Sequence, residues 1–286
     1  MKKKKYKPPF LLRAIQWTYP KLERIAPPLA HRFFMHLFFT PLKYRTPEKE
    51  LKAATFAEKF TIDIEGMKVQ CYRWGKSEKT ILFVHGWAGR ATQFRRFFKP
   101  FLAAGYQCVG FDGPAHGLSE GKSVTIKEFA DAMKKIAAQV GIPEAVIAHS
   151  FGGGASLFAA VEGFPMKKLI TIASPTIGDE IIHTYMTTLG ATESTRKAFK
   201  EAVIKRYGKP FEEYTALRLI HQLPHPINLM MVSDTDDREV PVNHAHAMKK
   251  EYPAVQLHIT SGLGHNRILK DNGVINYILQ YIGQQP

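Results

Sequence analysis

The chain has 286 residues, of which 45% are hydrophobic and 12% aromatic, and it carries a formal net charge of +15. This length and composition allow a large hydrophobic core and exclude a disordered or low-complexity chain. Its two cysteines, Cys71 and Cys108, lie in apolar, strand-like runs, which argues against a disulfide framework and favours a reducing compartment. We therefore expect a globular, cytoplasmic protein.

The basic charge is concentrated near the N-terminus. Residues 1–50 hold 12 Lys/Arg against 3 Glu, a net charge of +9, which leaves +6 for the other 236 residues. Two short apolar stretches follow the initial lysines, but neither could span a bilayer or matches a secretory signal. We assign residues 1–52 to a basic N-terminal segment with short helices. Its lysines form either a solvated tail or a peripheral attachment to an anionic membrane surface. Nucleic-acid binding is not expected, because no recognition module accompanies them.

From residue 57 onward, strands and helices alternate. Residues 60–74 alternate apolar and polar side chains around Glu65 and Gly66, which predicts a two-stranded hairpin. Further strands are expected within residues 80–87, 106–117, 144–150, 167–175, 227–234 and 255–262. Helices are expected within residues 91–105, 125–141, 151–163, 243–253 and 272–283, with Pro100 kinking or splitting the first. This alternation predicts an α/β fold with a mostly parallel central sheet and helices on both faces.

One interval interrupts the alternation. Residues 176–225 are mainly helical in pattern and separate two expected strands. We expect them to form a helical cap inserted in a domain of residues 53–286. The large side chains of the insertion either line an apolar substrate pocket or pack its helices together; they are Tyr185, Met186, Phe199, Tyr207 and Phe211.

The stretch AVIAHSFGGG, residues 145–154, is an apolar strand that ends at Ser150 and continues into glycines. Ala148 and Gly152 flank the serine, as a sharp strand-to-helix turn requires, because such a turn leaves no room there for large side chains. The turn would expose the serine hydroxyl and leave the N–H of Phe151 free at the helix start. A serine hydroxyl is a weak nucleophile, so this interpretation requires a base.

The candidate base is His265, which follows the last expected strand in a glycine-flanked loop. Among the other histidines, His149 should point away from the neighbouring hydroxyl, and His116 is better placed to shape its own loop. His244 and His246 lie two residues apart on an expected helix, where their side chains diverge, so we expect no metal site.

The acid that orients the base should follow the strand at residues 227–234. The sequence VSDTDDREVP offers Asp234, Asp236 and Asp237 there, and spacing alone does not choose among them. A backbone donor for a developing oxyanion is expected in FVHGWAGR, where Gly86 allows a close approach and the N–H of Trp87 would face the site. Trp87 and Phe151 are therefore the candidate oxyanion-hole residues.

Taken together, these motifs resemble the α/β-hydrolase superfamily over residues 57–285. AHSFGG resembles the nucleophile elbow, with Ala148 where glycine is commoner, and HGWAG resembles the HGxxG oxyanion loop. DGPAHGLSEG is similar to a loop written D-x-x-G-x-G-x-S, with Ala115 in place of a glycine, and GLGH is similar to the histidine loop. DREVP resembles a pattern in which the aspartate is the triad acid, which favours Asp237, with Asp236 next.

The resemblance implies a serine hydrolase that cleaves carboxylic esters of small-molecule or lipid-like substrates. Ser150 would attack the acyl group, His265 would remove the serine proton, and Asp237 would hold the imidazole. No cofactor or metal is implied. Two alternatives remain open: a ligand-binding protein of the same fold with negligible turnover, and an acyltransferase or lyase that uses the same triad.

Overall fold

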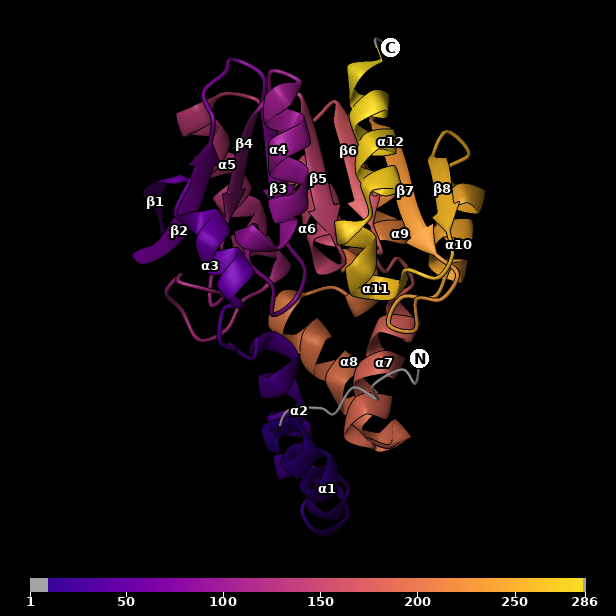
Figure 1. Ribbon diagram of the computed structural model, residues 1–286. Coiled ribbons are helices and arrows are strands. Elements are labelled where there is room, and N and C mark those ends of the chain that lie inside the picture. The colour runs from indigo at the N-terminus through magenta and orange to yellow at the C-terminus, as the bar shows by residue number, and fades with distance from the viewer. Residues whose placement is uncertain (1–9, 285–286) are drawn as a thin grey trace. The chain divides into compact units, whose positions relative to one another are not determined.

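The computed structural model describes residues 10–284 of the chain (Figure 1). The initial lysines, for which the sequence suggests a solvated tail or a membrane attachment, lie outside the described residues. The strands are β1 Glu58–Ile64, β2 Met67–Trp74, β3 Thr80–Val84, β4 Gln107–Phe111, β5 Ala145–His149, β6 Lys168–Ile172, β7 Asn228–Asp234 and β8 Gln256–Thr260. The helices are α1 Phe10–Ile25, α2 Pro27–Phe39, α3 Glu48–Ala54, α4 Arg95–Ala103, α5 Ile126–Val140, α6 Phe151–Val161, α7 Gly178–Leu189, α8 Glu193–Tyr207, α9 Ala216–Leu219, α10 Asn243–Glu251, α11 Gly264–Arg267 and α12 Asn272–Gly283.

The strands form one sheet in the order β1-β2-β4-β3-β5-β6-β7-β8. Strands β1 and β2 are the predicted hairpin, in which Ile64 pairs with Met67 across the turn. The pairs β1–β2 and β2–β4 are antiparallel, and every other neighbouring pair is parallel. The carboxyl ends of β3, β5, β6, β7 and β8 therefore meet at one edge of the sheet. In parallel sheets this edge is where binding and catalytic groups collect.

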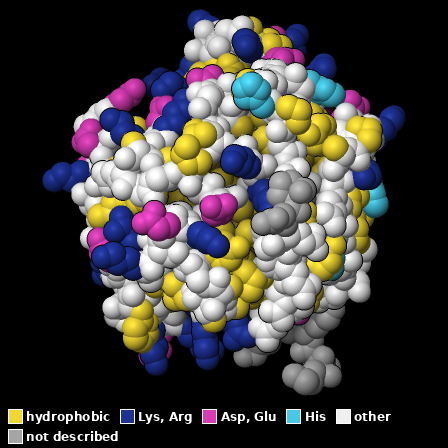
Figure 2. All heavy atoms as spheres, turned by 90° about the horizontal axis from the view of Figure 1, so that it is seen from above, with side chains coloured by type: hydrophobic (Ala, Val, Ile, Leu, Met, Phe, Trp, Pro, Cys, Tyr) yellow, Lys and Arg dark blue, Asp and Glu magenta, His cyan; other side chains and the backbone are white. Residues whose placement is uncertain are grey.

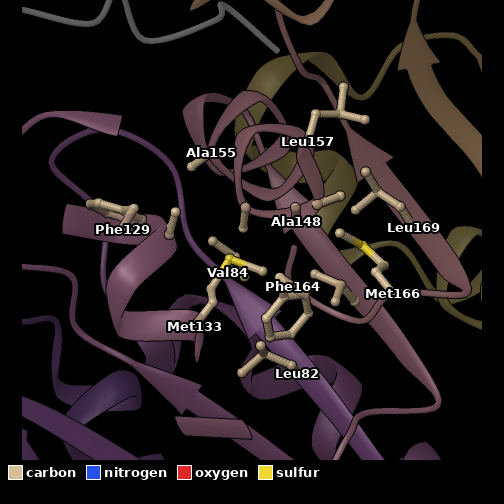
Figure 3. Packing of buried hydrophobic residues seen from close by; sticks show 14 of the residues in the cluster. Leu82, Val84, Phe129, Met133, Ala148, Ala155, Leu157, Phe164, Met166 and Leu169 are labelled. Atoms are coloured by element: carbon tan, nitrogen blue, oxygen red, sulfur yellow. The ribbon is translucent and has the colours of Figure 1, made fainter. Parts of the chain in front are cut away.

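Helices cover both faces of the sheet, as predicted (Figure 1). On one face, side chains of β3 and β5 pack against Phe129 and Met133 of α5 and Ala155 of α6 (Figure 3). On the other face, Phe97 and Phe101 of α4 and residues of α12 cover the sheet. All residues of β3, β4 and β5 are buried, which explains why these strands read as continuous apolar runs rather than alternating ones. Cys71 and Cys108 are buried, free thiols that belong to the two opposite cores.

Pro100 does not split the helix in which it lies. Helix α4 begins at Arg95, after a 3-10 turn over Ala91–Phe94, and continues through Pro100 to Ala103. A proline removes only one intrahelical N–H donor, and the burial of Phe97, Phe98 and Phe101 offsets that loss. Of the two effects that the sequence left open at Pro100, a kink or a split, the split does not occur.

The chain divides into two compact units. One unit combines the described part of residues 1–39 with residues 178–213, and the other comprises residues 40–177 and 214–286. The smaller unit has its own hydrophobic cluster, built from helices α1, α2, α7 and α8. The sheet unit also contains Ala216 and Leu219 of α9, although they belong to the interval that interrupts the strand–helix alternation.

Aromatic contacts hold the two segments of the smaller unit together. The Phe199 ring of α8 lies 5.6 Å from Phe34 and 4.5 Å from Phe38, both in α2. Met186 and Phe199 are buried in this cluster, and Tyr185, Tyr207 and Phe211 pack against it. Of the two roles open to these side chains from sequence, the structure shows helix packing.

None of the helices in the described residues is both long enough and apolar enough to cross a membrane. On the face shown in Figure 2, Lys and Arg side chains are spread among hydrophobic ones rather than gathered in one patch.

Because one hydrophobic cluster joins α2 to α8, a substitution in the core of α8 should also affect α2. Replacing Phe199 by Ala should destabilise this unit by about 3–5 kcal/mol, because a large aromatic side chain is removed from a packed core. Hydrogen exchange measured by mass spectrometry should then become faster in α2 as well as in α8. The control is Ile204→Ala in the same helix, where the side chain is 46% exposed. Faster exchange confined to α7 and α8 would contradict the shared core.

Candidate active site

The turn between β5 and α6 has the geometry that the sequence predicts. Ser150 has φ +51° and ψ −124°, a conformation that costs a non-glycine residue about 1–3 kcal/mol. Hydrogen bonds hold its backbone: its N–H donates to the carbonyl of Ile172 at 2.9 Å, and its carbonyl accepts from Ser174 Oγ at 2.9 Å. Within the described part of the chain the Ser150 hydroxyl forms no hydrogen bond. The turn thus presents a free, partly exposed hydroxyl.

Two glycines allow this turn to lie against the end of β3. A Cβ on Gly152 would lie 2.5 Å from the carbonyl oxygen of Val84 and 2.7 Å from that of His85. A Cβ on Gly86 would lie 2.8 Å from the Cβ of Ser150. Real Cβ atoms do not approach so closely, so both positions require glycine. Ala148, where the resembling family more often has glycine, is buried and fits without displacing the turn.

His265 and Asp237 meet at the carboxyl edge of the sheet. Nδ1 of His265, in α11, lies 2.8 Å from Oδ2 of Asp237, in the loop after β7. The other oxygen of Asp237 accepts hydrogen bonds from the N–H groups of Glu239 and Val240. The side chain of Asp237 is fully buried, so its orientation is fixed and its remaining acceptor position faces the imidazole. Of the three aspartates that the sequence left open, Asp237 is the one whose carboxylate contacts His265.

Asp234 performs a different task. Its carboxylate accepts hydrogen bonds from the N–H groups of Leu263 and Gly264, from the N–H of Asp236 and from the hydroxyl of Thr260. Burial opposes its ionisation, but these hydrogen bonds outweigh burial and lower the pKa of Asp234. The residue therefore anchors the loop that carries His265. Asp236 is exposed, and only its backbone takes part in this network.

His149 joins the serine turn to the histidine loop. Nε2 of His149 lies 3.0 Å from the carbonyl oxygen of His265, and the two imidazole rings are 4.7 Å apart. Burial, followed by the proximity of His265, lowers the pKa of His149 to about 3, so the ring is neutral and donates through Nε2. The residue beside Ser150 is therefore a structural link, as the sequence suggested.

The environment of His265 favours its charged form. Burial lowers its pKa, but the hydrogen bond to Asp237 and the nearby carboxylate of Glu239 outweigh burial, and the net pKa is raised. Oε2 of Glu239 lies 3.8 Å from Nε2 of His265. The sequence analysis did not single out Glu239, because an exposed charge in an acidic loop gives no signal of the atom it faces. No hydrogen bond between Ser150 and His265 is present among the described residues; in unliganded enzymes such contacts are often long.

Buried polar groups hold the loop after β3. Nε2 of His85 accepts from the N–H of Gly113 at 2.8 Å, so its Nδ1, 2.7 Å from the carbonyl of Gly86, is the donor. The buried carboxylate of Asp112 accepts from the N–H groups of Ala91 and Leu118. These contacts tie the loops after β3 and β4 to each other.

Trp87 follows Gly86 in the loop after β3, and Phe151 is the first residue of α6. Their rings lie 5.4 Å apart in an edge-to-face arrangement. In the described residues, neither N–H has a backbone or side-chain acceptor. Phe151 directly follows Ser150 in the chain, and Trp87 follows Gly86, on which an added Cβ would lie 2.8 Å from the Cβ of Ser150.

Known proteins provide an independent comparison. A family model described as "alpha/beta hydrolase fold" matches residues 79–230, more than half of the chain. The chain belongs to the alpha/beta hydrolase fold family. This confirms the resemblance and the fold class inferred from sequence.

Among curated proteins, the α/β-hydrolase chain is 29% identical over 160 residues to a dihydrolipoyllysine-residue acetyltransferase component of an acetoin cleaving system from Cupriavidus necator. The match covers 54% of this chain and 42% of that protein, so it spans less than half of the relative's length.

Similar solved structures include an esterase from Pyrococcus furiosus, with TM-score 0.62 and 20% identity, covering 85% of this chain and 95% of that one. A putative lipase from Acinetobacter baumannii has TM-score 0.62 and 15% identity, with coverages of 84% and 98%. A membrane phospholipase A, described as a bacterial virulence factor, has TM-score 0.61 and 15% identity, with coverages of 82% and 89%. At these identities the likeness establishes the fold.

The close approach at Gly152 gives a test within one helix. Gly152→Ala should lower stability by about 1–3 kcal/mol, because the new methyl group overlaps the backbone oxygens of Val84 and His85. Gly154→Ala is the matched control: nothing lies within 4 Å of its added Cβ, so it should be neutral or stabilising by up to about 1 kcal/mol. Thermal unfolding of both variants measures the difference, and equal midpoints would show that the turn does not lie against β3.

Proposed function

We propose that this α/β-hydrolase is a serine hydrolase that cleaves carboxylic esters. In this proposal Ser150 is the nucleophile, His265 the general base and Asp237 the acid that orients the base. The observation that carries the proposal is the 2.8 Å contact between His265 and the buried carboxylate of Asp237, at the same sheet edge as the strained turn of Ser150. Each group alone has a structural explanation, but their convergence supports acyl chemistry.

The first half of the reaction forms an acyl-enzyme. Oγ of Ser150 attacks the acyl carbon while Nε2 of His265 takes the hydroxyl proton. Nδ1 of His265 donates to Asp237, which stabilises the imidazolium that forms. The negative charge on the former carbonyl oxygen is stabilised by the N–H groups of Trp87 and Phe151. Collapse of this intermediate expels the alcohol, which leaves with the proton held by His265.

The second half releases the acid. His265 takes a proton from water, the hydroxide oxygen attacks the acyl carbon, and collapse of the second intermediate returns the proton to Oγ of Ser150. His265 carries each proton in both halves of the reaction, so this mechanism requires no metal or organic cofactor. A small-molecule ester can undergo both of these steps.

The surroundings of Ser150 favour a hydrophobic acyl group. The side chains of Trp87 and Phe151 are partly exposed and form an edge-to-face pair beside the turn. Aromatic faces of this kind bind apolar chains through surface burial. We therefore propose esters with apolar acyl chains as substrates, and a cytoplasmic location in keeping with the two free thiols.

Acyl transfer is the second candidate, because the curated relative is named as an acetyltransferase component. The same acyl-enzyme would then react with an alcohol or a thiol in place of water. Product analysis separates the two: hydrolysis yields free acid, whereas transfer yields a new ester or thioester when an acceptor is supplied.

The proposal is tested with a fluorophosphonate probe and p-nitrophenyl esters of increasing acyl length. Wild-type protein should be labelled and should hydrolyse the esters, whereas Ser150→Ala should lose the label and nearly all turnover, because the nucleophile is gone. Asp237→Asn should lower kcat roughly 10⁴-fold. The control is the neighbouring Asp236→Asn, which should leave kcat unchanged. A folded wild-type protein that takes no label but binds esters tightly would favour the ligand-binding alternative.

The pH dependence follows from the neighbours of His265. As a base, His265 must be neutral, so kcat/KM should fall as pH decreases through its raised pKa. Glu239→Gln removes a carboxylate that favours the imidazolium, which should lower the pKa of His265 and move the acid limb of the profile to lower pH. Glu213→Gln, which changes an acidic residue of the other compact unit, is the control. An unchanged acid limb in Glu239→Gln would show that another group controls it.

A further inference from the structure

Helix α1 has two unlike faces. Its inner face bears Ile15, Tyr19 and Glu23, which are buried against the insertion. The hydroxyl of Tyr19 lies 2.9 Å from Oγ1 of Thr195, and Glu23 accepts hydrogen bonds from the N–H and hydroxyl of Thr192. The inner face of α1 is therefore buried within the smaller unit.

The outer face of α1 combines exposed apolar and basic side chains. Trp17, Lys21 and Ile25 follow one another at four-residue intervals, and Arg24 lies between them on the same side of the helix. Trp17 is 68% exposed and Ile25 is 83% exposed. Nζ of Lys21 lies over the Trp17 ring, 2.9 Å from its centroid, so the basic group and the aromatic ring form one amphipathic surface.

The surface continues across the turn into α2. The N–H of Leu29 donates to the carbonyl of Ala26 at 3.0 Å, and Leu29 lies in the first turn of α2, four residues after Ile25. Leu29 is 60% exposed. We call Trp17, Lys21, Arg24, Ile25 and Leu29 the hairpin-tip surface.

This surface lacks the acidic residues that an ordinary solvent-facing helix carries. Residues 10–39 contain four Lys/Arg side chains and a single carboxylate, Glu23, which is buried and hydrogen-bonded to the insertion. Neither Lys21 nor Arg24 forms an ion pair with a described residue. A solvated face gains nothing from three exposed large apolar side chains, whereas an anionic lipid surface binds apolar side chains and basic groups together. Tryptophan, like tyrosine, is enriched at membrane–water interfaces.

We propose that the hairpin-tip surface binds the interface of an anionic lipid bilayer, with Trp17, Ile25 and Leu29 inserted among the lipids and Lys21 and Arg24 at the headgroups. The contact is peripheral. It depends on the described helices rather than on the lysines that precede them, and it is independent of the chemistry proposed for Ser150.

Sedimentation with vesicles tests the proposal. Full-length protein carrying Ser150→Ala, so that no lipid can be cleaved, is mixed with vesicles of equal parts phosphatidylcholine and phosphatidylserine or with phosphatidylcholine alone. It should pellet with the anionic vesicles and release as salt concentration rises. Binding equal on both vesicles, or absent from both, would overturn the proposal.

Variants locate the contact. Ile25→Ser with Leu29→Ser should reduce partitioning roughly tenfold or more, because two exposed apolar side chains lose their insertion. Ile142→Ser is the matched control, since Ile142 is also exposed, at 62%, but belongs to the sheet unit. Deletion of residues 1–8 should retain most of the binding. Loss of binding on that deletion, with none in the serine variants, would assign the contact to the terminal lysines instead.

Fluorescence provides a readout that does not depend on the stability of the serine variants. Trp17 emission should shift to shorter wavelength when anionic vesicles are added, because the indole leaves water. The shift should disappear in Trp17→Phe, which leaves Trp74 and Trp87 unchanged. A shift that persists in Trp17→Phe would place the contact elsewhere.

Discussion

The close packing of the β5–α6 turn against the end of β3 is the constraint on which the candidate site depends. Ser150 adopts an unfavourable positive φ because Gly86 and Gly152 let the neighbouring backbone come nearer than any side chain would permit. Hydrogen bonds from the turn to β6 and to Ser174 hold that conformation in place. The strain is offset by the buried sheet around it, and the result is a hydroxyl that projects away from the core.

At the same edge of the sheet, buried polar residues hold the loop that carries His265. His265 lies in a short helix that follows a glycine loop, a segment with little apolar packing of its own. Asp234 binds the loop N–H groups and His149 binds the carbonyl of His265, so the imidazole is positioned from both sides. Asp237 then contacts Nδ1 of the positioned imidazole. Asp234 anchors the loop, His149 links it to the serine turn and Asp237 orients the imidazole. Asp234 and Asp237 come from the end of one strand and the short loop that follows it.

The smaller unit shows how distant segments can share one core. Neither the two N-terminal helices nor α7 and α8 could bury their apolar faces alone, and together they enclose an aromatic cluster. The polar contacts of Tyr19 and Glu23 with the insertion specify how α1 packs. Because the inner face of α1 is filled in this way, its outer face is available for a partner of opposite charge.

The fold class could be predicted from the amino-acid sequence alone, because buried parallel strands and amphipathic helices differ in the period of their apolar residues. The sequence also indicated Ser150 and His265 as candidate site residues, since a serine between small residues and a histidine in a glycine loop both follow strands and have few structural explanations. The three-dimensional structure adds contacts that the spacing of residues in the sequence does not predict. It distinguished Asp237 from Asp234 and Asp236 by which carboxylate faces the imidazole, and it revealed Glu239 beside Nε2. It also grouped the N-terminal helices with the insertion, because helix packing depends on contacts between residues more than 100 positions apart, which leave no local pattern.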